Sequence, residues 1–489
     1  MKKVVLFSFL FLLIACAREP SRGEVAASIA TTEESQVFSE VSEEKPNKIG
    51  KVKVYIENTL SMYGYLPEKR VVNTDFRNAV NELLIASKGS YGNGNVELSL
   101  INNATSVNVN IDNNLDNIDV KSLTKNYSQG RGSSDFDKLF KDLLQDWEDE
   151  ELLVFIADFI YSPDAGTEVT SGLDRLRQNI TDAFQKAKGA EQLAVNILHL
   201  GSDFYGKYYD IDENVHLGID NRPYYIFIIG NENNVRRYSE NIVPRVKKYD
   251  LRNKYFLTPS SIQIKQYSAL PFTLNTGHFL AKRNPMANAH IKEVIVKSSL
   301  NKSPQVQLAV TADLGDIPVS EEYLMDINNY DLNDNRIILR EVGVIQNKKV
   351  KLSDGTEEAI KSNDLRFAEN ATHCFLLSFP NTYKGTIELS LKKNTPQWVS
   401  DVSIKDGQND KDIKTNTLKQ SQTFGFNSIV KGINDAQRLK NPKNEYFRLT
   451  LDIDQEKTGS GIGAIIGWLI GLVIIGIIIF IVIRNKQRK

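Results

Sequence analysis

The sequence lacks most of the residue patterns that catalytic and metal centres require. Its 489 residues include two cysteines and five histidines. None of these has the His-x-x-x-His or Cys-x-x-Cys spacing of common zinc sites. Neither a Gly-x-Ser-x-Gly elbow nor a phosphate-binding Gly-Lys-Ser/Thr loop occurs, so the usual motifs of serine hydrolases and nucleotide-binding loops are missing. We therefore expect a protein that is not an enzyme.

An excess of charge of one sign is also missing. The 60 basic and 61 acidic residues give a formal net charge of −1, which argues against the basic face that a nucleic-acid partner needs. The 41% hydrophobic and 25% charged residues are typical of a large globular protein. Cys374 lies in an apolar run at 373–377, and we expect it to be buried without a disulfide partner.

Apolar runs lie at both ends of the chain. Residues 4–14 follow two lysines, as in a secretory signal, and Leu13-Ile14-Ala15-Cys16 resembles the bacterial lipobox, which implies lipidation at Cys16 after removal of the signal. An ordinary cleaved signal and an uncleaved anchor are the alternatives. Residues 462–483 carry no charge over 22 positions, enough for a transmembrane helix. The basic residues 484–489 would then be a cytoplasmic tail. These features predict a bacterial inner-membrane protein with most of the chain on the periplasmic side.

Four glycines recur every fourth residue around the start of the predicted transmembrane helix, at Gly459, Gly463, Gly467 and Gly471. Small residues at this spacing allow close helix packing, which predicts self-association or a membrane partner. The alternative is that glycine is simply common in membrane helices.

The chain between the two ends divides into three segments. Residues 17–48 are rich in Glu, Ser, Ala and Thr and are expected to be a disordered tether. Residues 49–250 alternate apolar strands, at 52–56, 96–101, 152–157, 193–200 and 224–229, with helical stripes near 74–86, 134–147 and 173–188. This alternation predicts a doubly wound α/β domain with a mostly parallel sheet.

The loops that follow the predicted strands carry oxygen-bearing side chains. They are Glu57-Asn58-Thr59-Leu60-Ser61-Met62, Gly132-Ser133-Ser134-Asp135-Phe136 and Phe155-Ile156-Ala157-Asp158. Together they resemble the three metal-site loops of von Willebrand factor type A (vWA) domains, a resemblance that covers roughly residues 50–245. It implies a Mg²⁺ site in which Thr59, Ser61 and Ser134 offer hydroxyls and Asp158 a carboxylate. Glu57 replaces the aspartate of the family and Leu60 its glycine.

Residues 258–455 show short strands that alternate apolar and polar residues, with turn-rich stretches between several of them. This pattern predicts a β-sandwich-like domain, with one helix-like insertion near 424–436. The predicted fold class is therefore a vWA-like α/β domain, a β-sandwich-like domain and one C-terminal transmembrane helix.

The predicted function is binding of a macromolecular partner in the cell envelope, a protein, through the vWA-like site. Two alternatives remain open. One is a metal-dependent hydrolase that uses Glu57 and Asp158 to activate water, and the other is an inert structural subunit of a membrane complex. The run Asp203–Asp210 mixes aromatic and polar residues, which suits either a contact surface or a packed loop.

Overall fold

The computed structural model describes residues 48–67, 73–102, 106–109, 134–163, 167–282, 290–405, 407–456 and 484. All of these belong to one compact unit, residues 47–489. The lipidation candidate Cys16, the predicted tether up to residue 47, and the glycines at 459, 463, 467 and 471 lie outside the described residues.

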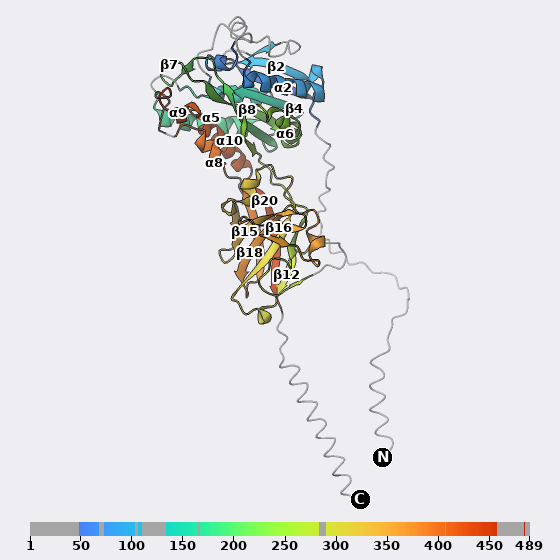
Figure 1. The fold of residues 1–489 in the computed structure, drawn as a ribbon. Helices are drawn as coiled ribbons and strands as arrows, with labels where there is room; N and C mark the ends of the chain where they lie inside the picture. The colour runs from blue at the N-terminus through green and yellow to red at the C-terminus, as the bar shows by residue number, and fades with distance from the viewer. Residues whose placement is uncertain are drawn as a thin grey trace, which may run out of the picture. The chain divides into compact units, whose positions relative to one another are not determined.

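One mixed sheet dominates the first half of the chain (Figure 1). Its strands are β1 (Lys51–Glu57), β2 (Val96–Ile101), β3 (Ser106–Val109), β4 (Glu151–Ala157), β5 (Leu193–Asp203), β8 (Asn221–Asn231) and β9 (Leu251–Leu257). Their order is β3-β2-β1-β4-β8-β5-β9. Strand β1 runs parallel to its neighbours β2 and β4, whereas the pairings β2–β3, β4–β8, β5–β8 and β5–β9 are antiparallel. The prediction of a mostly parallel sheet was therefore wrong.

Burial explains why strand direction escaped the prediction. Strands β4 and β8 are buried along nearly their whole lengths, because both faces of the sheet are covered, and continuous apolar strands are typical of parallel sheets without requiring them. Residues 204–220, which join β5 to β8, contain only the small hairpin of β6 (Tyr208–Tyr209) and β7 (Val215–His216). The chain makes no helical crossover here, so it returns antiparallel.

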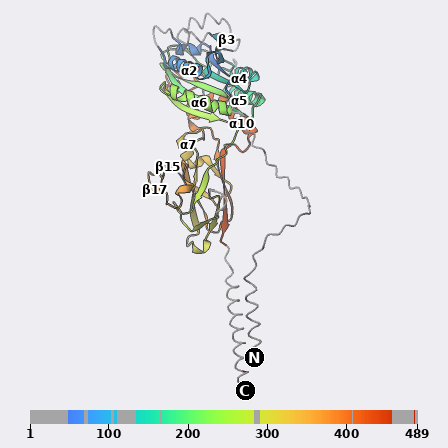
Figure 2. The ribbon, with the colours of Figure 1, turned by 90° about the vertical axis from the view of Figure 1, so that its right-hand side faces the viewer.

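Helices cover both faces of the sheet (Figures 1 and 2). Helices α2 (Asp75–Tyr91) and α6 (Glu232–Val246) bury their apolar stripes in the core of one face. Helices α4 (Phe136–Gln145) and α5 (Val169–Lys186) pack on the other. Side-chain caps fix where these helices begin: Thr74 accepts the backbone N–H of Arg77, and Asp135 accepts that of Lys138.

A late part of the chain completes this α/β core. Helices α8 (Gln397–Asp401), α9 (Thr417–Gln420) and α10 (Phe426–Lys440) lie between two strands of the β-rich segment in sequence. Nevertheless, Val399, Phe426 and Ile433 pack in the core of the second sheet face. Helix α10 lies against α5, where Thr181 Oγ1 donates to the Gly432 carbonyl at 3.0 Å. The helix predicted near 424–436 therefore belongs to the α/β core.

The remaining strands form two larger sheets with a common apolar core. The six-stranded sheet contains β10 (Tyr267–Leu270), β13 (Gln305–Ala312), β18 (His373–Pro380), β15 (Ile338–Gln346), β16 (Lys349–Lys351) and β17 (Glu357–Ala359), in that order. The five-stranded sheet contains β11 (Phe279–Ala281), β12 (Glu293–Val296), β20 (Glu445–Gln455), β19 (Gly385–Lys392) and β14 (Tyr330–Leu332). All their pairings are antiparallel except β12–β20. The short helix α7 (Glu321–Met325) precedes β14. Cys374, in β18, is fully buried as predicted, and burial raises the pKa of its thiol to about 12.

The transmembrane helix must be removed from the fold class. Within the described ranges no helix is both long and apolar enough to cross a membrane, and the predicted span 462–483 lies outside them. The longest described helix, α5, has 18 residues. It buries one stripe and carries charged residues such as Asp174 and Arg175 on the rest of its surface, as expected of a helix that packs on a sheet. The corrected fold class is a mixed α/β sheet covered by helices, together with two packed β-sheets.

Candidate functional site

The five predicted site residues come together at one edge of the mixed sheet. Glu57 ends β1 and Asp158 follows β4. These two strands are parallel neighbours, with Ile56 beside Ile156, so the two carboxylates leave the sheet at the same edge. Ser61 begins the 3-10 helix η2 (Ser61–Tyr65), Thr59 lies two residues before it, and Ser134 lies two residues before α4.

Hydrogen bonds join these side chains. Glu57 Oε1 accepts a hydrogen bond from Thr59 Oγ1 at 3.1 Å and another from the hydroxyl of Ser134. Thr59 Oγ1 lies 3.0 Å from Ser61 Oγ, within hydrogen-bonding distance. On the other side of the site, Asp158 Oδ1 accepts the backbone N–H of Ile160 at 3.2 Å. The three loops therefore form one polar cluster that contains two carboxylates and three hydroxyls.

Both carboxylates are almost completely buried, with 2% of Glu57 and 1% of Asp158 exposed. Burial, reinforced by the negative charge of Asp158, raises the pKa of Glu57 well above its ordinary value. Burial also raises the pKa of Asp158, although the Ile160 N–H, the Ser61 hydroxyl and the charge of Arg222 oppose the rise. Two buried carboxylates so arranged require a proton or a cation for stability.

Arg222, which no pattern in the sequence pointed to as a site residue, is 1% exposed and lies at the start of β8. Its Nη1 donates to the carbonyls of Lys419, Gln420 and Gln422 at 3.3, 2.7 and 3.1 Å. Its guanidinium lies 4.6 Å from the centre of the Tyr208 ring, and its Nη2 has no hydrogen-bond partner in the described structure. The one feature of the sequence that could have pointed to this residue is a single arginine placed directly before the apolar run of β8.

The residues present fit a Mg²⁺ ion. All the side-chain donors are oxygens, which is the ligand type that Mg²⁺ prefers. Moreover, Glu57 Oε2 is buried and has no hydrogen-bond partner among the described residues. The described ranges contain no group of three or more His, Cys, Asp or Glu side chains suited to a metal, so the hydroxyls of Thr59, Ser61 and Ser134 would be essential. A bound cation would offset both carboxylate charges and offer a coordination position to an acidic group.

No protein-family model, curated protein or solved structure matches the chain. The likeness to vWA domains consequently stays a prediction that rests on the three loops.

The two departures from the vWA pattern have different structural consequences. Leu60 has φ −61° and ψ −31°, ordinary right-handed helical values that do not require a glycine. Glu57 is one methylene longer than the aspartate of the family, and its Oε1 accepts two of the hydroxyls that would bind the cation. Only the substitution at Glu57 therefore changes the chemistry of the site.

The first loop is also held by close packing. Tyr205 N donates to the Gly64 carbonyl at 2.7 Å, and a Cβ on Gly64 would lie 2.3 Å from Cε2 of Phe204. Only glycine fits this contact between η2 and the segment after β5. Within the run Asp203–Asp210, Phe204 and Tyr208 are buried whereas Tyr205 is half exposed, so this run is for the most part a packed loop.

Proposed function

We propose that the chain is a bacterial cell-envelope lipoprotein whose α/β core binds a protein partner through a divalent-cation site. Glu57, Thr59, Ser61, Ser134 and Asp158 hold the cation, and an acidic side chain of the partner completes its coordination. The observation that supports this proposal is the convergence of three separate loops on one buried, hydrogen-bonded cluster with two carboxylates. Such a cluster is costly without a counter-charge.

The cation should stabilise the folded protein. A ligand that binds only the native state contributes RT ln(1 + [L]/Kd), which is about 2.7 kcal/mol at a hundredfold excess over Kd. We expect a thermal shift when Mg²⁺ or Mn²⁺ is titrated into the detergent-solubilised full-length chain, and no shift in Asp158→Ala. Asp142→Ala is a control, because Asp142 is exposed on α4 and is not one of the five site residues. An equal shift in Asp158→Ala would contradict the assignment of Asp158.

Partner binding distinguishes this function from hydrolysis. We expect chelation by EDTA and the Asp158→Ala substitution each to abolish capture of the envelope partner, with no turnover of envelope peptides or glycans in the parent protein. Turnover that is lost in Asp158→Ala would instead establish the hydrolase.

Lipidation is tested at the cysteine. We expect Cys16→Ser to abolish incorporation of labelled fatty acid, because the thiol is the acceptor of the lipid. Cys374→Ser is the matched control and should retain the label, because Cys374 is buried in β18. Label that persists in Cys16→Ser would exclude the lipobox.

A further inference from the structure

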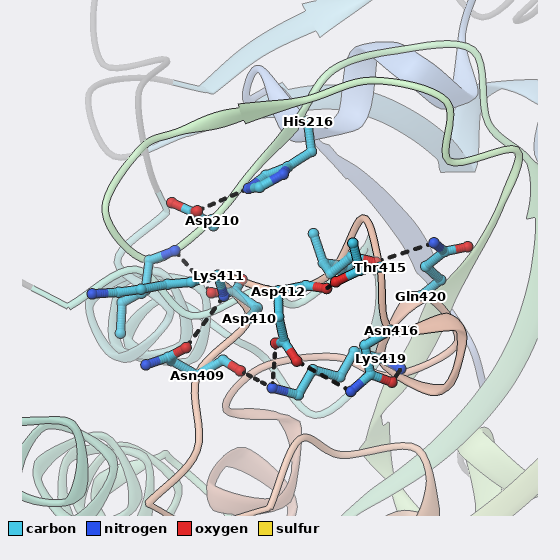
Figure 3. A network of polar contacts seen from close by, with 12 residues as sticks. Asp210, His216, Asn409, Asp410, Lys411, Asp412, Thr415, Asn416, Lys419 and Gln420 are labelled. Carbon is cyan, nitrogen blue, oxygen red and sulfur yellow. Dashed lines mark hydrogen bonds and ion pairs between the residues drawn. The ribbon is translucent and has the colours of Figure 1, made fainter.

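A segment from the C-terminal half of the chain lies against the candidate site. We call residues 407–424 the cap segment. It contains α9 and leads into α10. In the part of the chain that the structure describes, no strand pairs it with the mixed sheet. Side chains and isolated backbone contacts hold it in place, and Figure 3 shows the polar contacts within the segment and around Asp410.

The cap segment contacts Ile160 and Tyr161, which lie a short distance along the chain after Asp158. Ile413 is fully buried and packs in one small apolar cluster with Ile160 and Tyr208. At the end of the segment, the Phe424 carbonyl accepts the Tyr161 backbone N–H at 2.9 Å. Because Ile160 and Tyr161 lie two and three residues after Asp158, these contacts place the cap segment beside the site.

Asp410 is the main polar anchor. Its side chain is fully buried. Its Oδ2 accepts the Tyr208 hydroxyl at 2.5 Å and its Oδ1 accepts the Ile211 backbone N–H at 2.9 Å. Both donors belong to the β6–β7 hairpin region. An exposed ion pair between Lys411 and Asp212, at 2.5 Å, joins the same two segments.

Arg222 connects the cap segment directly to the site. The three carbonyls that Arg222 Nη1 binds all belong to the cap segment, and the charge of the same guanidinium opposes part of the rise that burial causes in the pKa of Asp158. While the cap segment is docked, it therefore holds the positive charge of Arg222 at the start of β8, on the strand that pairs with β4 where β4 leads into Asp158. A fixed positive charge at this place opposes the entry of a divalent cation.

The cap segment is internally cross-linked, so it can move as a unit. Lys419 Nζ donates to the Asn409 carbonyl at 2.6 Å and pairs with Asp412. Gln420 Nε2 donates to the Ile413 carbonyl at 3.1 Å. These bonds close the loop upon itself and do not depend on the sheet. The described attachments of the cap segment to the rest of the protein are single side-chain and backbone contacts without a strand ladder, and segments held in this way open locally more readily than the strands of the core.

We propose that the cap segment is a gate, which must undock before a divalent cation and an acidic partner group reach the site. This regulation rests on the proposed function, because it governs access to the same five side chains. In the docked state both site carboxylates are buried, and three cap-segment carbonyls hold Arg222. In the undocked state Arg222 loses its three carbonyl partners, and the site opens to solvent.

The test uses the full-length chain in detergent and Mn²⁺ alone as the probe. Tyr208→Phe removes the hydroxyl that binds Asp410 and keeps the aromatic ring. Losing one buried hydrogen bond should raise the open population, and with it the Mn²⁺ association rate, roughly fivefold. Hydrogen exchange of the amides in residues 407–424 should accelerate in parallel. The matched control is Tyr255→Phe, which removes a buried hydroxyl bonded to Asn434 at 3.1 Å, outside the cap segment.

A second variant leaves the core untouched. Lys411→Glu places like charges together at the exposed pair with Asp212 and should also speed Mn²⁺ association. Equal Mn²⁺ rates in the parent, Tyr208→Phe and Lys411→Glu would overturn the gate while leaving the cation site intact. Absence of Mn²⁺ binding in the parent and in both variants would overturn the proposed function, and the gate with it.

Discussion

Phe426→Ala is expected to destabilise the folded protein by about 3–5 kcal/mol, the usual cost of removing a large aromatic side chain from a core. Phe426 begins α10 and is fully buried. Its ring stacks on Tyr225 of β8 with 3.9 Å between ring centres, and the ring of Trp398 lies 6.2 Å away. The substitution would leave a cavity between the sheet and a helix encoded about 200 residues later.

Urea unfolding followed by tryptophan fluorescence measures this loss. Phe272→Ala is the matched control, because Phe272 is 47% exposed and its removal should change stability by less than about 0.5 kcal/mol. A similar small change in Phe426→Ala would mean that α10 adds little to the α/β core.

Local patterns in the sequence located most elements of the α/β core. The stripe from Phe136 to Trp147 corresponds to α4, which ends at Gln145, and the apolar run 152–157 lies within β4. Periodicity and apolar runs are local properties, so one window of sequence suffices to detect them. The helix near 424–436 was found in the same way.

What such patterns could not provide is the partner of each element. The periodicity of α10 shows that one face is buried, but it does not say that α5 covers this face. Similarly, the run Tyr224–Ile229 of β8 is apolar because both faces of the sheet are covered, and this burial does not distinguish parallel from antiparallel pairing. Contacts between residues far apart in the sequence determine both the packing partner of α10 and the direction of β8.

In the candidate site, too, some residues could be predicted from local sequence and others could not. Local sequence was enough to predict five site residues, because each follows a strand or precedes a helix and the ends of neighbouring strands lie close together. They are Glu57, Thr59, Ser61, Ser134 and Asp158. The location of Arg222 and the cap segment at the site depends instead on contacts between residues some 200 positions apart in the chain. No motif marks these contacts, so only the folded structure places a guanidinium and three carbonyls beside the site.

The buried charge of Glu57 makes stability depend on pH in a defined direction. The pKa of Glu57 in the folded protein is raised well above 4.5, whereas the unfolded chain should titrate near 4.3, at about the model-peptide value. Between these two pKa values the native state binds more protons than the unfolded state, so stability falls as pH rises. For one such group the slope reaches about 1.4 kcal/mol per pH unit. This group therefore contributes most below the unfolded pKa, and its contribution is lost as pH rises through the folded pKa.

Glu57→Gln should remove this slope. The amide oxygen still accepts hydrogen bonds from Thr59 and Ser134, but no charge is desolvated. In EDTA we expect the variant to be more stable than the parent at pH 8 and nearly equal to it at pH 5, as measured by urea unfolding at each pH. Glu97→Gln is the matched control, because this glutamate lies at the surface of β2 with its side chain 39% exposed, and it should leave the profile unchanged.

Excess Mg²⁺ should reverse the order of stability at pH 8, because the cation stabilises only a site with both carboxylates. Such a reversal would distinguish stabilisation of the Glu57 carboxylate by a bound cation from stabilisation by protonation. If Glu57→Gln were more stable than the parent with Mg²⁺ as well as with EDTA, the carboxylate would take no part in binding the cation. A variant less stable than the parent at every pH in EDTA would mean that the Glu57 charge is already compensated within the fold, and the pH dependence would need another origin.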